Sequence, residues 1–251
     1  MIRWLLLPSL AVAALAAQPP TPSAPANGAA GGQRLRAELL AQQPPENSSV
    51  PAVLKIRAGD GERRDIPVRL RTERVDSATW RAIYETTSAG DAAERLVVTR
   101  RTGGVNDYAL ASGGRGAAPL IGTNLFRPFA GSDFSAADLG LEFLHWPTQT
   151  LVKSEMRRGR PCKVLVSTAA PGSGGAYARV LSWIDNETGG LLRAEAYDAQ
   201  GRLVKEFSLR SFKKVNGQWQ LREMEIITYP QDSRTRLEFE LDLNASRTDP
   251  P

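Results

Sequence analysis

The chain contains few of the side chains that carry most metal and redox chemistry. Its 251 residues include one cysteine and one histidine. A single cysteine cannot form an internal disulfide or a cysteine-rich zinc site, and a single histidine cannot build a multi-histidine metal cluster. The sequence therefore predicts no metal and no cofactor, and these absences favour a protein that holds a ligand over one that transforms it.

Long apolar runs are also scarce. Residues 4–15 form one such run, which follows Arg3 and is too short to span a bilayer comfortably. Small residues, Ala14 and Ala16, lie near its end, so we interpret residues 1–16 as a secretory signal peptide. No cysteine follows it to carry a lipid anchor. We expect a soluble protein of the periplasm of a Gram-negative bacterium.

Composition divides the rest of the chain. Residues 17–32 are mostly Pro, Ala, Gly and Ser without charge, which is typical of a flexible linker. A folded domain is expected over residues 33–245 and a disordered tail over residues 246–251. The net charge of +5 is dispersed among residues of alternating sign, so we expect no nucleic-acid partner.

Short β-type runs separated by turn residues make up most of the domain. The candidate strands are residues 52–58, 66–75, 79–87, 95–101, 107–111, 163–168, 176–185, 191–198, 203–215, 218–229 and 235–243. Asn216 and Gly217 give the strongest hairpin signal. The prediction is a mainly β (α+β) fold with a single curved antiparallel sheet, because so large a sheet must curl to bury one face.

Two helices are expected beside the strands. Residues 33–43 have apolar residues at helical spacing and are followed by Pro44. Residues 134–146 are predicted to form an amphipathic helix, in which Ser135 is the N-cap and Asp138 completes a capping box. Its apolar stripe consists of Leu139, Phe143 and Trp146. The simplest place for this helix is across the concave face of the sheet.

The sequence contains few candidate catalytic groups. There is no Gly-x-Ser-x-Gly motif, and His145, the only histidine, is expected to flank its helix end. Cys162 is expected to be a buried thiol. Asp133 and Asp138 could form an acid/base pair, but near a helix start such carboxylates more often serve capping. We therefore expect no enzymatic activity.

Large apolar side chains point instead to a ligand cavity. The candidate cavity and lid residues are Trp80, Tyr84, Phe126, Phe134, Leu139, Phe143, Trp146, Trp183, Phe207 and Trp219. For any one of them ordinary core packing is the alternative. Taken together they predict an apolar cavity suited to acyl chains or another hydrophobic ligand.

Two segments carry a resemblance to a known family. Residues 125–139 (LFRPFAGSDFSAADL) and residues 191–205 (LLRAEAYDAQGRLVK) resemble outer-membrane lipoprotein-sorting proteins, which are LolA-like. The most specific pieces of the resemblance are residues 131–134 and the hairpin of residues 197–205. The resemblance implies an incomplete β-barrel, with an N-terminal helix and a central helical lid over a hydrophobic cavity. It also implies a carrier of lipoprotein acyl chains or another lipid, with an inner-membrane donor and an outer-membrane acceptor as partners.

This resemblance suggests a physical mechanism in which residues 126–146, called here the lid segment, open to admit an acyl chain. Gly131 is the expected hinge, and Asp133, Ser135 and Asp138 are expected to fix the start of the helix. Two alternatives stay open: a non-catalytic structural or adaptor protein of the envelope, and a hydrolase with a cleft around Asp133, Asp138 or His145.

Overall fold

The computed structural model describes residues 28–44, 46–87, 93–215 and 218–241, without the side chains of residues 215, 218 and 219. The expected signal peptide and the expected tail lie outside the described residues, as does most of the expected linker. The turn predicted at residues 216–217 lies outside them too. Within the described part, no helix is long and apolar enough to cross a membrane.

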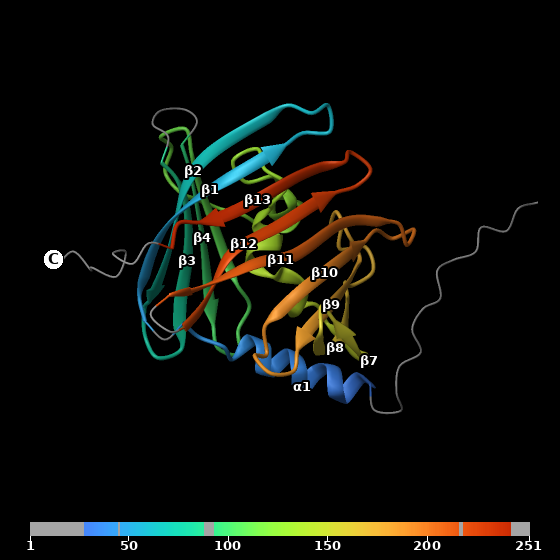
Figure 1. Cartoon of the computed structure of the whole chain (residues 1–251). Helices are drawn as coiled ribbons and strands as arrows, with labels where there is room; N and C mark the ends of the chain where they lie inside the picture. Colours follow the sequence, from blue (N-terminus) through green and yellow to red (C-terminus); the bar gives the residue numbers. More distant parts are fainter. Residues whose placement is uncertain (1–27, 45, 88–92, 216–217, 242–251) are drawn as a thin grey trace, which may run out of the picture.

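One antiparallel sheet dominates the described residues (Figure 1). Its strands are β1 (Ser48–Arg57), β2 (Arg63–Arg74), β3 (Thr79–Thr86), β4 (Glu94–Arg101), β5 (Asp107–Ser112), β6 (Ala118–Pro119), β7 (Thr148–Arg157), β8 (Arg160–Thr168), β9 (Arg179–Asp185), β10 (Leu191–Tyr197), β11 (Leu203–Val215), β12 (Gln218–Thr228) and β13 (Ser233–Phe239). Their order is β6-β5-β4-β3-β2-β1-β13-β12-β11-β10-β9-β8-β7. The predicted curved antiparallel sheet is confirmed, and it does not close into a barrel.

The strand order explains why a segment crosses the sheet. Strands β6 and β7 are neighbours in sequence but lie at opposite edges of the sheet. The chain between them must therefore run from one edge to the other, and Figure 1 shows it inside the curve. This connection contains the lid segment. We call the sheet face that it covers the inner face.

Alternating apolar residues build the core on the inner face. Leu54 of β1, Val68 of β2 and Leu96 of β4 are buried there with Phe134 of the lid segment. A second cluster joins Leu165, Val180 and Ile184 of β8 and β9 to Phe143 and Leu144 of the lid segment. Each half of the lid segment thus has its own part of the sheet to cover.

The two parts of the sheet differ in regularity. The pairings within β1–β5 have no register shift among the described residues. Shifts typical of β-bulges occur in β7, β10 and β11. Because bulges bend a strand and increase its twist, they favour curvature in this second part of the sheet.

Helix α1 (Gly28–Leu40) corrects the expected linker boundary, since it begins at Gly28 rather than near residue 33. The reason is close packing on β7. A Cβ atom at Gly32 would lie 2.4 Å from the carbonyl oxygen of Gln149, and one at Gly31 would lie 3.1 Å from Cδ2 of Leu151. The glycines that suggested flexibility therefore let the helix approach the edge strand.

The central helix is shorter than predicted. Instead of one helix over residues 134–146, the segment forms α2 (Ala136–Gly140) and the 3₁₀ turn η3 (Glu142–His145). Between them Leu141 has left-handed backbone angles, φ 53° and ψ 45°. The side chain of Asn106 donates to the Gly140 carbonyl oxygen at 2.9 Å, which gives that carbonyl a partner outside the helix. The predicted capping box of Ser135 and Asp138 is confirmed.

Strand β7 is missing from the candidate strands, and β6 lies in a segment without one. The β7 sequence breaks strict alternation because Leu151 and Val152 are adjacent apolar residues. A register shift between Leu151 and Lys153 accommodates them in the sheet. The bulge thus removes the period-two signal on which strand prediction depends.

Candidate functional site

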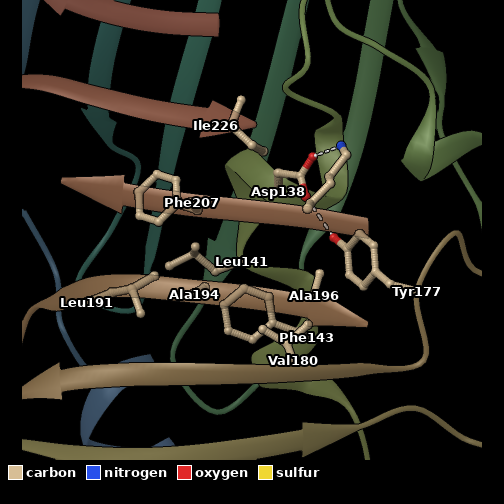
Figure 2. Close-up of a pocket in the computed structure, with 11 residues that line it drawn as sticks. Asp138, Leu141, Phe143, Tyr177, Val180, Leu191, Ala194, Ala196, Phe207 and Ile226 are labelled. Atoms are coloured by element: carbon tan, nitrogen blue, oxygen red, sulfur yellow. Dashed lines mark hydrogen bonds and ion pairs between the residues drawn. The ribbon is translucent and has the colours of Figure 1, made fainter. Parts of the chain in front are cut away.

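A largely buried ion pair joins the start of α2 to the sheet. The Nζ atom of Lys205 on β11 lies 2.6 Å from Oδ2 of Asp138 and donates to the Asp133 carbonyl oxygen at 2.8 Å. The hydroxyl of Tyr177 donates to the other Asp138 oxygen at 2.8 Å. Figure 2 shows these two interactions of Asp138 as dashed lines beside a group of apolar side chains.

The Tyr177 hydroxyl keeps its proton and acts as the hydrogen-bond donor to Asp138. Burial, and then the neighbouring Asp138 carboxylate, raise the pKa of Tyr177 well above its usual 10. Its ring also contacts two candidate lid residues, Phe126 edge-on at 5.1 Å and Trp146 at 5.8 Å between ring centroids. The ring therefore holds both ends of the lid segment against the loop before β9, and the hydroxyl holds Asp138 between them.

Asp133 is bound to the last strand. Its carboxylate accepts hydrogen bonds from the hydroxyls of Ser233 and Thr235 on β13, the latter at 2.7 Å. Its backbone N–H donates to the Thr235 hydroxyl at 2.9 Å. Since Asp133 and Asp138 both have their oxygens engaged, this geometry leaves neither poised as a general acid or base.

The two most specific segments of the family resemblance thus meet in space. Residues 131–134 supply Asp133, and the hairpin around residues 197–205 supplies Lys205, which contacts its carbonyl oxygen. Gly131 has a left-handed φ of +63°, a backbone conformation that favours glycine. Its role as a hinge stays a prediction.

A second set of polar contacts holds the middle of the lid segment. The hydroxyl of Tyr108 donates to Oε2 of Glu142 at 2.7 Å. The guanidinium of Arg100 donates to the Leu139 carbonyl oxygen at 3.2 Å and lies over the Trp80 ring at 5.0 Å. Burial raises the pKa of Glu142.

His145 lies at the end of η3, as expected. Neither of its ring nitrogens has a hydrogen-bond partner among the described residues. Burial first, and then the positive charges of Arg100 and Arg36, lower the pKa of His145 to about 4. The imidazole is therefore neutral near pH 7.

Two small pockets lie between these polar contacts. The first, called here the sheet-side pocket, has about 30 Å³ open to the centre of a water molecule. It is lined by Asp138, Leu141, Phe143, Tyr177, Val180, Leu191, Ala194, Ala196, Lys205, Phe207 and Ile226 (Figure 2). All but three of these side chains are apolar, so the pocket offers an apolar wall with a polar end at Asp138.

The second, called here the α1-side pocket, is open to about 70 Å³ by the same measure. It is lined by Leu39, Leu40, Gln42, Arg100, Leu141, Phe143, Leu144, Ile184 and Leu191. Leu141, Phe143 and Leu191 line both pockets. These three side chains therefore separate two apolar spaces on the same inner face.

The predicted cavity residues fall into four groups. Phe143 and Phe207 line a pocket. Trp80, Tyr84, Phe126, Phe134, Leu139 and Trp146 are in the inner-face core clusters and do not line either described pocket. The side chain of Trp219 on β12 lies outside the described residues.

Trp183 forms the fourth group, because it does not lie on the predicted cavity or lid. It packs with Cys162 and Val164 in a separate cluster on the outer face, because neighbouring Ile184 on β9 points inward. Its ring lies between the guanidinium groups of Arg157 and Arg193, at 5.3 and 5.8 Å. Cys162 is fully buried in this outer cluster, in line with the expected structural thiol.

Several pocket residues were not singled out in the sequence. Ala194 and Ala196 of β10 alternate along one face and supply small side chains to the wall of the sheet-side pocket. Lys205 was visible only as part of the family-like hairpin. Among the described residues no group of three or more His, Cys, Asp or Glu side chains could hold a metal ion.

The open, curved antiparallel sheet with a segment across its inner face is a LolA-like fold. A putative outer-membrane lipoprotein-sorting protein domain from Vibrio parahaemolyticus has a TM-score of 0.71 at 19% identity, over 85% of this chain and 92% of that one. A DUF1329 family protein from Desulfovibrio piger has a TM-score of 0.69 at 21% identity, over 85% and 91%. A LolA superfamily protein from Nitrosomonas europaea has a TM-score of 0.58 at 15% identity, over 85% and 92%.

The chain belongs to a family whose model carries the description "uncharacterized protein" and matches residues 119–246. That region includes the whole lid segment and strands β7–β13. No curated protein matches the sequence.

Proposed function

We propose that this protein is a non-enzymatic periplasmic carrier that binds the acyl chains of lipoproteins, or another lipid, between the lid segment and the sheet. The observation that carries the proposal is the pair of apolar pockets that share Leu141, Phe143 and Leu191 in their walls. Displacement of these side chains would join the two pockets into one apolar channel. The LolA-like fold supports the same assignment.

The described conformation corresponds to a closed carrier. Pockets for drug-sized ligands typically have about 300–1,000 Å³, whereas the two pockets here have about 30 and 70 Å³. An acyl chain must therefore move the lid segment to enter. We expect the lid segment to bend at Leu141, because its left-handed backbone angles cost about 1–3 kcal/mol at a non-glycine residue.

The energies favour such an exchange. Burial of each CH₂ group contributes about 0.8 kcal/mol, so a chain of about 16 carbons gains on the order of 10 kcal/mol before ordering costs. Separation of a buried ion pair such as Lys205–Asp138 costs about 3–5 kcal/mol. A long chain can offset that cost and a short one of about four carbons cannot, so opening would depend on chain length.

The proposed route runs from an inner-membrane donor to an outer-membrane acceptor. It rests on the predicted signal peptide at residues 1–16 and on the likeness in fold to lipoprotein-sorting domains. A partner would promote release by offering the chain a better site or by stabilising the closed lid segment. This step needs no covalent chemistry, which agrees with the engaged carboxylates of Asp133 and Asp138.

The test is native mass spectrometry of mature protein purified from a periplasmic extract, followed by displacement of a fluorescent fatty-acid probe. We expect co-purified lipid and displacement that strengthens with chain length. Lys205→Met should increase probe access, while Lys153→Met, which removes an exposed ion pair with Glu155 on β7, should not. Absence of both co-purified lipid and probe binding, in wild type and in Lys205→Met, would overturn the proposal.

A structural or adaptor role in the envelope is the second candidate, and the small pocket volumes favour it. Under that role the lid segment is permanent core, and Lys205→Met would destabilise the protein without creating lipid binding. The hydrolase alternative gains no support, because Asp138 lines the sheet-side pocket while Asp133 and His145 line neither of the two described pockets.

A further inference from the structure

The α1-side pocket contains one charged side chain, Arg100 of β4, among its lining residues. Its terminal nitrogen donates to the Leu139 carbonyl oxygen, and its Nε atom is buried without a hydrogen-bond partner in the described structure. No carboxylate of the described residues lies within ion-pair distance of it. By contrast, Arg193 on the outer face has both Glu195 and Glu206 as partners.

A cation in this position is electrostatically incomplete. Burial lowers the pKa of Arg100, which reflects the cost of a charge removed from water. The carboxyl group whose charge acts on Arg100 is Glu142, which is engaged by Tyr108 and whose pKa is raised by burial. The other titratable groups near it bring no negative charge: the pKa values of Tyr84 and Tyr108 are raised, His145 is neutral and Arg36 is a cation. A bound anion would therefore supply the negative charge that the described residues do not place beside Arg100.

The surroundings of Arg100 suit an amphiphile rather than a small ion. The other lining residues are apolar except Gln42, which is also the exposed one among them. Leu191 continues the wall into the sheet-side pocket. A ligand with a single negative end and an apolar chain would match both the guanidinium and the wall.

We propose that Arg100 anchors the anionic end group of a single-chain lipid, with the acyl chain lying along Leu191 toward the sheet-side pocket. This proposal rests on the proposed carrier function and adds a headgroup preference to it. Guanidinium groups bind carboxylate and phosphate through charge-assisted, often bidentate hydrogen bonds, and the free Nε supplies one of the donors. A neutral lipid of equal length would leave the guanidinium unpaired.

The experiment compares hexadecanoate with hexadecanol at pH 8 by displacement of a neutral fluorescent probe from the mature protein. Hexadecyl phosphate tests a second anionic group, and acetate and inorganic phosphate alone test for simple ion binding. We expect wild type to bind both anionic lipids at least tenfold more tightly than the alcohol, and the small ions not to compete. Arg100→Gln should abolish this preference, and Arg100→Lys should keep part of it.

The preference, rather than the absolute affinity, separates recognition from structure. Because Arg100 also contacts Leu139 of the lid segment, a purely structural role would change the affinities for acid and alcohol equally. Arg36→Gln is the matched control, since Arg36 donates to the Leu144 carbonyl oxygen at 2.6 Å but does not line the pocket. It should keep the preference.

Any one of four outcomes overturns the inference. Equal binding of acid and alcohol by wild type, or equal loss of both in Arg100→Gln, rejects Arg100 as an anion anchor and leaves the carrier function standing. Competition by acetate or phosphate alone at the same concentration rejects the amphiphile. If no acyl ligand of either kind binds, the proposed function fails with it.

Discussion

The two halves of the lid segment are held by two different kinds of packing. Phe134 and Leu139 lie in a filled core against β1–β5, where the sheet has regular pairing. Leu141 and Phe143 lie against the bulged strands and line both pockets. The contrast indicates that the core around Phe134 is a fixed base, and that any opening separates the Lys205–Asp138 ion pair and moves the second half, beyond Leu141, away from the sheet.

The largest effect should come from removal of a base residue. Phe134→Ala should lower the free energy of unfolding by about 3–5 kcal/mol, because the ring is fully buried in a filled core. Phe143→Ala should cost less than Phe134→Ala, because a ring that borders two pockets has fewer packing contacts to lose, and it should increase probe binding by enlarging both pockets. Urea unfolding and probe titration measure both. An equal cost for the two variants would contradict the contrast.

The ion pair at the boundary between the two halves gives the next effect. Lys205→Met should lower the free energy of unfolding by about 3 kcal/mol, because it leaves the Asp138 carboxylate buried without its cation. The double variant Lys205→Met/Asp138→Asn should recover part of this loss. Lys153→Met should change the same quantity by no more than about 0.5 kcal/mol. A small effect of Lys205→Met would mean that the pair is not needed to hold α2.

The glycines of α1 test how closely this helix packs on β7, the edge strand in the second part of the sheet. Gly32→Ala should cost about 2 kcal/mol, because its Cβ would meet the backbone of β7 at 2.4 Å. Gly31→Ala should be nearly neutral, since Leu151 can move and alanine favours the helix by up to about 1 kcal/mol. Thermal unfolding of the two variants checks this. Similar melting temperatures would show that α1 does not pack as closely as described.

The smallest effect is a pH dependence located in the second half. The pKa of His145 is about 4 in the folded protein and about 6.5 unfolded, so the unfolded state binds more protons between these values. The full difference in pKa corresponds to about 3 kcal/mol. The ring is only partly buried, so solvent screening reduces the expected loss of stability between pH 6.5 and 4 to roughly 1–2 kcal/mol. Glu142, whose pKa is raised, acts in the opposite direction near its own titration.

The measurement for this prediction is the difference in unfolding free energy between wild type and His145→Gln across that pH range. The difference removes the contribution of Glu142, which both proteins share. We expect it to change steadily below pH 6.5. A flat difference would show that His145 is not buried in its neutral form.

Local signals in the sequence predicted much of this fold. Ser135 and Asp138 specify a helix start through contacts within four residues, and that start is confirmed. The predicted end of the same helix is wrong. Gly140 and Glu142 contact Asn106 and Tyr108, which are distant in the sequence, so no local signal indicates where the helix stops. Strand β7 was missed for a similar reason: a bulge interrupts its alternation.

The candidate site was harder to predict than the fold. Aromatic size identified Phe143 and Phe207, but size does not reveal which face of a strand points inward, as Trp183 shows. The partners of Asp138 lie 39 and 67 residues away in sequence, at Tyr177 and Lys205. Arg100 had no distinguishing pattern, because an arginine in a strand becomes notable only when its burial is known.

The pairing of β1 with β13 has a consequence for folding kinetics. These strands are the first and last in the sequence, yet they are hydrogen-bonded to each other at the centre of the sheet, with Leu54 opposite Leu237. As the chain is synthesised, one edge of β1 stays without its neighbour until residues 233–239 appear. Contacts so distant in sequence form slowly, and an unpaired edge strand invites association with other chains. Loss of β13 by truncation would therefore separate two half-sheets rather than trim one end.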